Sequence, residues 1–159
     1  MHGAVTIGDN IRIVSGNEVV TFGLDGVTCG VINCYDLRFP ELARAIALRG
    51  AQLMFIPTQW PMERIGHWHI LTRARALENL FYVAGANAAG CEPNAAGETG
   101  VIIGCGYSSI VDPWGTVIAS CSEEAKAAVI AEVDFARVAE LRSFLGVFNA
   151  RKPDVYNLK

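Results

Sequence analysis

Long apolar runs, a signal sequence and excess charge are all missing from this sequence of 159 residues. No 18 consecutive residues are uninterruptedly apolar, and Met1-His2-Gly3 does not begin a signal-peptide pattern, so we expect a cytoplasmic protein that does not enter membranes. The net charge of -3 offers no basic surface, so nucleic acid is not an expected partner. The five cysteines include no C-x-x-C pair, which predicts neither a metal site nor a disulfide framework, and nothing implies a cofactor.

The residues that are present suit one α/β domain over residues 1–159. A hydrophobic fraction of 52% is ample for a core. Apolar runs between turn residues predict strands, and helical periodicity between Pro40 and Gly50 predicts the first helix. We predict strands at 18–22, 27–32, 52–56, 81–86, 108–111, 116–120 and 128–133, helices at 40–49, 67–79 and 135–142, turns at 23–26 and 112–115, and a loop at 91–100. Because strands and helices alternate in the first half and a hairpin follows, the sheet should be mixed.

Cys34 stands where a buried strand gives way to a helix. The apolar run 27–33 ends at this thiol, and the polar segment 35–41 opens the next helix. Backbone amides at such a junction are unpaired and carry partial positive charge, so they can lower a thiol pKa and hold an oxyanion. Cys34 is therefore a candidate nucleophile. The alternative is a small buried core residue, as free cysteines often are.

Four segments of the chain carry a resemblance to a known family. They are GVINCYDLRFPELARAIALRGAQLMFIPTQWP at 30–61, HWHILTRARALENLFYVAGAN at 67–87, GYSSIVDPWG at 106–115 and NARKPDVY at 149–156. In this order they resemble the nitrilase superfamily, the carbon-nitrogen hydrolases. The resemblance implies an α-β-β-α sandwich with a mixed sheet, of which this chain would be the C-terminal part, about three-fifths of a domain.

The resemblance also implies a reaction and the residues that carry it out. Cys34 would attack a nitrile or amide carbon and form a thioester that water hydrolyses, without a metal or a cofactor. The amide of Tyr35 would help to hold the oxyanion, and Gln59 and Trp60 would line the pocket at the carboxyl end of the next strand. The alternative for Trp60 is a core residue. The expected partner is a small-molecule amide or nitrile, in the omega-amidase-like branch an amide of a small carboxylic acid. The expected assembly is a homo-oligomer formed across the helix faces.

Two catalytic groups of that family have no counterpart before Cys34. The family's base is an upstream glutamate, and its oxyanion-stabilising lysine lies on a strand before the cysteine, whereas the first lysine here is Lys126. In relatives that lysine precedes a pattern that reads here as Met1-His2, so we expect the chain to begin one residue after it. A second family glutamate, which assists substrate placement, falls on or near Asp9. The rival hypothesis is an inactive truncated paralogue that acts only as a subunit or interaction partner.

Other polar residues are expected to have structural roles. His67 and His69 would suit a Cys-His pair of the papain type, but the family uses no catalytic histidine, so surface or packing roles are favoured. Arg38 and Glu41 should stabilise the turn and the following helix by ion pairing. A structural polar network or a subunit contact is expected for Arg73, Arg75 and Glu78, and no function for Cys29, Cys91, Cys105 and Cys121.

Overall fold

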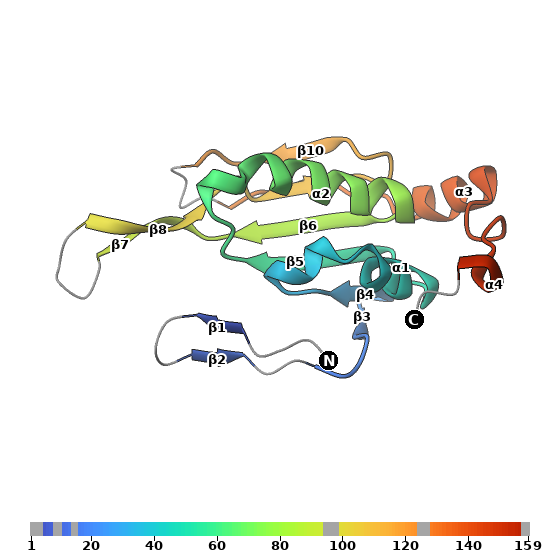
Figure 1. Cartoon of the computed structure of the whole chain (residues 1–159). Coiled ribbons are helices and arrows are strands. Elements are labelled where there is room, and N and C mark those ends of the chain that lie inside the picture. The colour runs from blue at the N-terminus through green and yellow to red at the C-terminus, as the bar shows by residue number, and fades with distance from the viewer. Residues whose placement is uncertain (1–4, 8–10, 14–15, 94–98, 124–127, 157–159) are drawn as a thin grey trace.

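A six-stranded mixed sheet forms the centre of the molecule (Figure 1). The computed structural model describes residues 5–7, 11–13, 16–93, 99–123 and 128–156. The strand order is β10-β9-β6-β5-β4-β3. The strands are β3 (Thr21–Leu24), β4 (Val27–Val31), β5 (Leu53–Thr58), β6 (Tyr82–Asn87), β9 (Ser109–Val111) and β10 (Val117–Ser120). The three central strands β4, β5 and β6 are parallel, and the outer pairs are antiparallel. The α/β class and the mixed sheet predicted from the sequence are confirmed.

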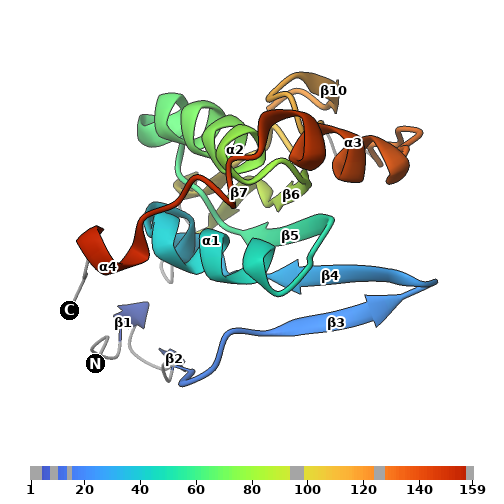
Figure 2. The same ribbon diagram turned by 90° about the vertical axis from the view of Figure 1, so that its right-hand side faces the viewer.

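Two helices connect the parallel strands and cover one face of the sheet (Figure 2). A 3₁₀ turn, η1 (Cys34–Arg38), leads from β4 into α1 (Pro40–Leu48), and η2 (Met62–Arg64) leads from β5 into α2 (Ile65–Asn79). Proline at the first position of α1 suits a helix start, because its backbone has no hydrogen to leave unpaired. Two further helices follow the last strand, α3 (Ala136–Leu145) and α4 (Pro153–Tyr156). No helix in the part of the chain that the structure describes is long and apolar enough to cross a membrane.

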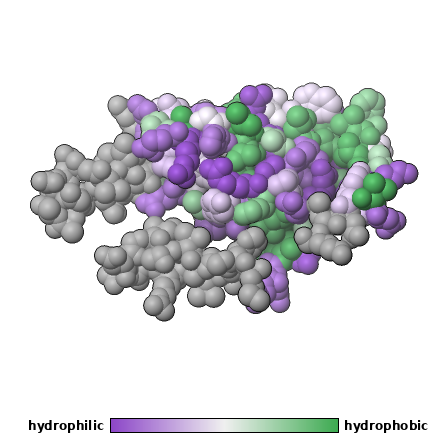
Figure 3. Space-filling model, viewed as in Figure 1, coloured by the Kyte–Doolittle hydropathy of each residue, from purple (hydrophilic) through white to green (hydrophobic). Residues whose placement is uncertain are grey.

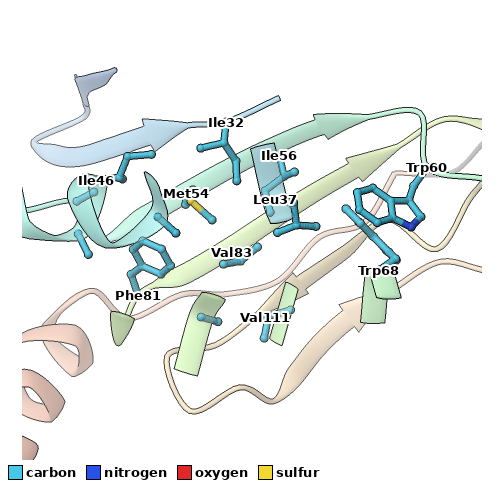
Figure 4. Packing of buried hydrophobic residues seen from close by; sticks show 14 of the residues in the cluster. Ile32, Leu37, Ile46, Met54, Ile56, Trp60, Trp68, Phe81, Val83 and Val111 are labelled. Atoms are coloured by element: carbon cyan, nitrogen blue, oxygen red, sulfur yellow. The ribbon is translucent and has the colours of Figure 1, made fainter. Parts of the chain in front are cut away.

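The hydrophobic core lies between this sheet face and the two helices (Figure 4). Met54, Ile56 and Val83 come from the strands, and Ile46 and Trp68 come from the helices; all five side chains are fully buried. The outer surface of the helix layer carries intermixed hydrophilic and hydrophobic side chains (Figure 3). The core thus fixes β4 and β5, whose carboxyl ends lead into the segments that carry the candidate site.

Two predicted elements were wrong. The predicted loop at 91–100 contains parts of the hairpin formed by β7 (Ala89–Pro93) and β8 (Thr99–Cys105), while residues 94–98 lie outside the described residues. Its Gly and Asn content favours a loop, but pairing with the apolar segment after it gives an antiparallel ladder. The predicted strand at 128–133 is not a strand, and Ile130 within it is 87% exposed. The alternation of residue types in this segment is compatible with an extended backbone. An extended segment becomes a strand only where a neighbouring strand forms backbone hydrogen bonds with it.

Another small hairpin pairs β1 (Val5–Ile7) with β2 (Ile11–Ile13).

Candidate active site

Cys34 is the first residue of η1 and has a left-handed backbone. Its φ angle is +45°, a conformation that costs a non-glycine residue free energy and is found disproportionately at functional sites. The backbone nitrogen of Ile32 still donates to the carbonyl of Phe55 on β5 at 3.1 Å, so the chain turns away from the sheet immediately before the thiol. Cys34 is half-buried and not in a disulfide. The core alternative is therefore not supported, and the strand-to-helix junction predicted from the sequence is present.

The amide of Tyr35 lies in the first part of this turn. The earliest bond that spans the turn is donated by the Asp36 nitrogen to the Asn33 carbonyl at 3.0 Å, and the Asp36 carboxylate accepts from the Asn33 nitrogen at 3.0 Å. The amide of Tyr35 precedes that bond, in the position where 3₁₀ and α-helices leave donors without an internal partner. The Tyr35 side chain is exposed and packs edge-on against Phe39, with ring centroids 5.6 Å apart.

Arg75 on α2 holds the same turn from the core side. Its Nε and Nη2 donate to the carbonyl of Leu37 at 3.1 and 2.9 Å, and its Nη1 pairs with the Glu78 carboxylate at 3.0 Å. The side chain is buried, with an exposed fraction of 5% for the residue. The sequence predicted a structural network for Arg75 and Glu78, and the structure confirms it. What the sequence did not reveal is that Arg75 of this network binds η1, the turn that begins at Cys34.

Arg38 closes η1 and lies against aromatic rings. Its guanidinium carbon is 4.9 Å from the centroid of Trp60 and 5.7 Å from that of Tyr35, and its Nη2 is 3.4 Å from Nδ1 of His67. The predicted ion pair between Arg38 and Glu41 was wrong, because no such pair forms among the described residues. Glu41 instead lines a groove beside α1 together with Arg44 and Arg151. Arg38 is therefore a cation on the same 3₁₀ turn as the candidate nucleophile, and no salt bridge to a carboxylate neutralises it in the described part of the chain.

Trp60 and Gln59 follow β5 at the same end of the sheet. Trp60 is only 2% exposed, its Nε1 donates to the carbonyl of Arg64 at 2.8 Å, and its ring centroid is 6.0 Å from that of Trp68. Its place beneath Arg38 makes it a support for that guanidinium. Gln59 is exposed at the same edge.

Asn87, at the carboxyl end of β6, holds the main chain of Trp60. Its Oδ1 accepts from the Trp60 nitrogen at 2.7 Å, and its Nδ2 donates to the Gly106 carbonyl at 2.7 Å. The sequence analysis assigned no role to this residue, although it ends one of the segments that carry the family resemblance.

The remaining candidates lie apart from the thiol or outside the description. His67 contacts Arg38, and His69 packs edge-on against Tyr107 with centroids 5.3 Å apart, so neither histidine is paired with Cys34 among the described residues. Asp9 lies outside the described residues. Burial raises the pKa of the thiols of Cys29 and Cys105, which makes them poorer nucleophiles. No group of three or more metal-ligating side chains occurs in the segments that the structure describes.

Comparison with known sequences identifies a family and its relatives. A family model described as carbon-nitrogen hydrolase matches residues 8–143. The 2-oxoglutaramate amidase of Bacillus subtilis (strain 168) is 38% identical over 148 residues, covering 93% of this chain and 54% of that protein. The omega-amidase NIT2 of Homo sapiens is 33% identical over 155 residues, covering 97% and 54%. The chain thus spans about half the length of these curated relatives.

Solved structures show the same likeness. The NitFhit protein of C. elegans superposes with a TM-score of 0.82 at 34% identity, covering 98% of this chain and 38% of that one. An amidase from Nesterenkonia sp. AN1, a mutant whose active-site cysteine carries acrylamide after Michael addition, superposes with a TM-score of 0.67 at 28% identity, covering 84% and 50%.

Proposed function

Because this chain belongs to the carbon-nitrogen hydrolase family, we propose that it is the nucleophile-bearing part of an amidase, with Cys34 as the nucleophile. The observation that carries the proposal is the left-handed, half-buried Cys34 at the junction of β4 and η1. A thiol held on a strained strand-to-helix turn, next to amides without an internal partner, has the geometry that nucleophilic acyl transfer needs. The acrylamide adduct of the Nesterenkonia amidase supports the assignment, since it formed on that protein's active-site cysteine.

The proposed reaction has two acyl-transfer steps. The Cys34 thiolate adds to the amide carbon, and the resulting oxyanion is held by the amide of Tyr35. The carbon–nitrogen bond then breaks, the nitrogen leaves as ammonia or an amine after taking a proton, and a thioester remains on Cys34. Water adds to the thioester carbon, the carbon–sulfur bond breaks, and the carboxylic acid and the free thiol are released. No metal or redox group takes part in this scheme.

The proposed substrate is the amide of a small carboxylic acid that bears a second carboxylate. Arg38 supports this choice, because its guanidinium shares a turn with Cys34 and is left without a carboxylate partner among the described residues. Trp60 lies against the guanidinium, whose N–H groups at its edge can make a bidentate contact with a substrate carboxylate. The 2-oxoglutaramate named for the Bacillus relative is an amide of this chemical kind. Gln59 and Asp9 are proposed as further pocket contacts.

A base and a second oxyanion donor must complete the site. The family resemblance assigns them to a glutamate and a lysine, and no lysine precedes Cys34 in these 159 residues. We propose that both come from residues outside these 159. Reading the coding frame upstream of Met1 tests this directly: an in-frame glutamate followed by a Lys-bearing strand supports it, and an upstream stop codon supports the inactive paralogue.

The decisive assay uses the protein as its gene encodes it. Glutaramate should be hydrolysed with release of ammonia, and Cys34→Ala should lower kcat by at least about 10³-fold, since the nucleophile is removed while the fold is kept. Cys121→Ala, which removes another partly exposed thiol, is the matched control and should retain full activity. Hydrolysis that survives Cys34→Ala would refute the assignment. In the same assay, Arg38→Gln should raise KM for glutaramate far more than for the neutral analogue pentanamide.

A further inference from the structure

Asn87 uses both ends of its buried carboxamide. Oδ1 accepts from the backbone nitrogen of Trp60 at 2.7 Å, while Nδ2 donates to the carbonyl of Gly106 at 2.7 Å and approaches Sγ of Cys105 at 3.0 Å. The residue is 8% exposed. Asn87, at the end of β6, therefore links the segment after β5 with the segment after β8.

The hydrogen bonds of the Asn87 side chain begin where the backbone pairing between β5 and β6 ends. The register between β5 and β6 ends at Thr58 and Asn87, and the backbone then diverges. Two backbone bonds continue the connection, from the Ala88 nitrogen to Thr58 at 2.9 Å and from the Cys105 nitrogen to the Trp60 carbonyl at 2.8 Å. Asn87 supplies the acceptor for the Trp60 nitrogen, which would otherwise be a buried donor without a partner.

The main chain of Trp60 determines where its indole lies, and the indole supports Arg38. The ring is fixed at its far end by the bond from Nε1 to the Arg64 carbonyl at 2.8 Å, and its face lies 4.9 Å from the Arg38 guanidinium carbon. A contiguous path of contacts thus runs from Asn87 through Trp60 to Arg38, which shares η1 with Cys34.

We propose that Asn87 is a positioning residue of the active site: its carboxamide fixes the backbone of Trp60 and, through the indole of Trp60, holds the guanidinium of Arg38 beside Cys34. This inference rests on the proposed function, in which Cys34 is the reacting atom. Only an uncharged side chain that both accepts and donates can satisfy the Trp60 nitrogen and the Gly106 carbonyl together. Leucine at this position has the same branching and the same number of side-chain heavy atoms, and it satisfies neither group.

The test measures the charge at Cys34 without requiring turnover. The Cys34 thiolate displaces iodide from iodoacetate, which is an anion, and from iodoacetamide, which is neutral; both rates are read by mass spectrometry on the peptide containing Cys34. The ratio of the two rates cancels the thiolate fraction and reports the local cation. At low ionic strength Arg38→Gln should lower this ratio by about fivefold, the scale of one nearby charge in a solvated site.

Asn87→Leu should lower the ratio nearly as far as Arg38→Gln does, and the double variant should show no further fall. Asn87→Ala, also uncharged, serves if the leucine variant does not fold. The matched control is Tyr82→Phe, which removes the hydrogen bonds with Asp134 at the opposite end of β6 and should leave the ratio unchanged. Added salt should lower the ratio in the wild-type protein and in Tyr82→Phe only.

One result would overturn the inference: a folded Asn87 variant whose ratio of the two rates equals that of the wild type. Equal falls of both rates give this result as well and would indicate general loosening. This result does not bear on the proposed function, which fails instead if amide hydrolysis survives Cys34→Ala. The two failures are therefore distinguishable.

Discussion

A single buried guanidinium stabilises the turn on which the proposed chemistry depends. Arg75 donates twice to the Leu37 carbonyl and pairs with Glu78. Replacing it by Met keeps an unbranched side chain but leaves the carbonyl without these donors and Glu78 without its cation. We expect Arg75→Met to lower the free energy of unfolding by about 2–4 kcal/mol. The substitution removes the charged donor, while the Leu37 carbonyl and the Glu78 carboxylate that it bound remain in place. Urea denaturation followed by circular dichroism measures the change.

The control for Arg75 lies on the same helix. Arg73 is exposed and donates one hydrogen bond, to the Gly115 carbonyl at 2.8 Å. Arg73→Met should therefore cost about 1 kcal/mol or less. If both variants lost the same free energy of unfolding, the burial of Arg75 and its two hydrogen bonds to the Leu37 carbonyl would add nothing to stability.

The sequence singled out the candidate nucleophile more readily than the residues that support it. Cys34 could be singled out because a buried strand, a polar turn and a helix start are all visible as residue patterns. Arg75 and Asn87 could not be assigned to the site, since their partners Leu37 and Trp60 lie far away in the sequence. The positive φ of Cys34 was equally invisible, because a left-handed cysteine is a consequence of tertiary contacts and not of local preference.

Close approach of helix and strand determines the packing at the element scale. A Cβ added to Gly85 on β6 would lie 2.6 Å from two carbons of the Trp68 ring on α2, and this ring is tied by its Nε1 to the Tyr107 carbonyl at 2.8 Å. Because the ring has little freedom to move, Gly85→Ala should lower the free energy of unfolding by about 1–3 kcal/mol. Thermal and urea unfolding of the purified variant measure this cost.

Gly66, in the first turn of α2, is the matched control for Gly85. Nothing lies within 4 Å of a Cβ added there. Gly66→Ala should be neutral or raise the free energy of unfolding by up to about 1 kcal/mol, since alanine restricts the unfolded chain and favours helix. A Gly85→Ala variant as stable as the wild type would mean that Trp68 shifts without cost.

The same scale shows why some elements were predictable and others were not. Helix α1 is bounded by local signals, with Pro40 at its start and Gly50 just after its end, and the predicted span of 40–49 differs from Pro40–Leu48 by one residue at its end. The hairpin of β7 and β8 depends on pairing between two segments, and composition alone favoured a loop for the first of them. Each of these segments forms a strand because the other one pairs with it, so the residues of one segment alone do not predict the strand.

At the scale of the whole molecule, the sheet is covered on one face only in the described residues. The opposite face carries Phe22 stacked on Phe55, with centroids 6.2 Å apart, and a shallow apolar hollow of about 350 Å³. The hollow is lined by Phe22, Val31, Phe55, Ile56, Pro57, Ala84 and Ala86. An apolar face of this kind requires a covering layer, which in an α-β-β-α sandwich is the second sheet. We therefore expect the 159 residues expressed alone to self-associate through this face.

A charge placed on the open face should have opposite effects in two contexts. Phe22 is 40% exposed on the edge strand β3, so Phe22→Glu in the isolated chain should reduce self-association and binding of a hydrophobic dye while retaining the circular dichroism spectrum. In the protein as its gene encodes it, the same substitution would bury a carboxylate against the second sheet and lower the free energy of unfolding by about 2 kcal/mol or more. Glu18→Gln, a polar change outside the hollow, should alter neither property. Sedimentation velocity over a concentration series measures the first effect, and urea unfolding measures the second. If Phe22→Glu were harmless in the gene-encoded protein, the open sheet face would not be the interior of a sandwich.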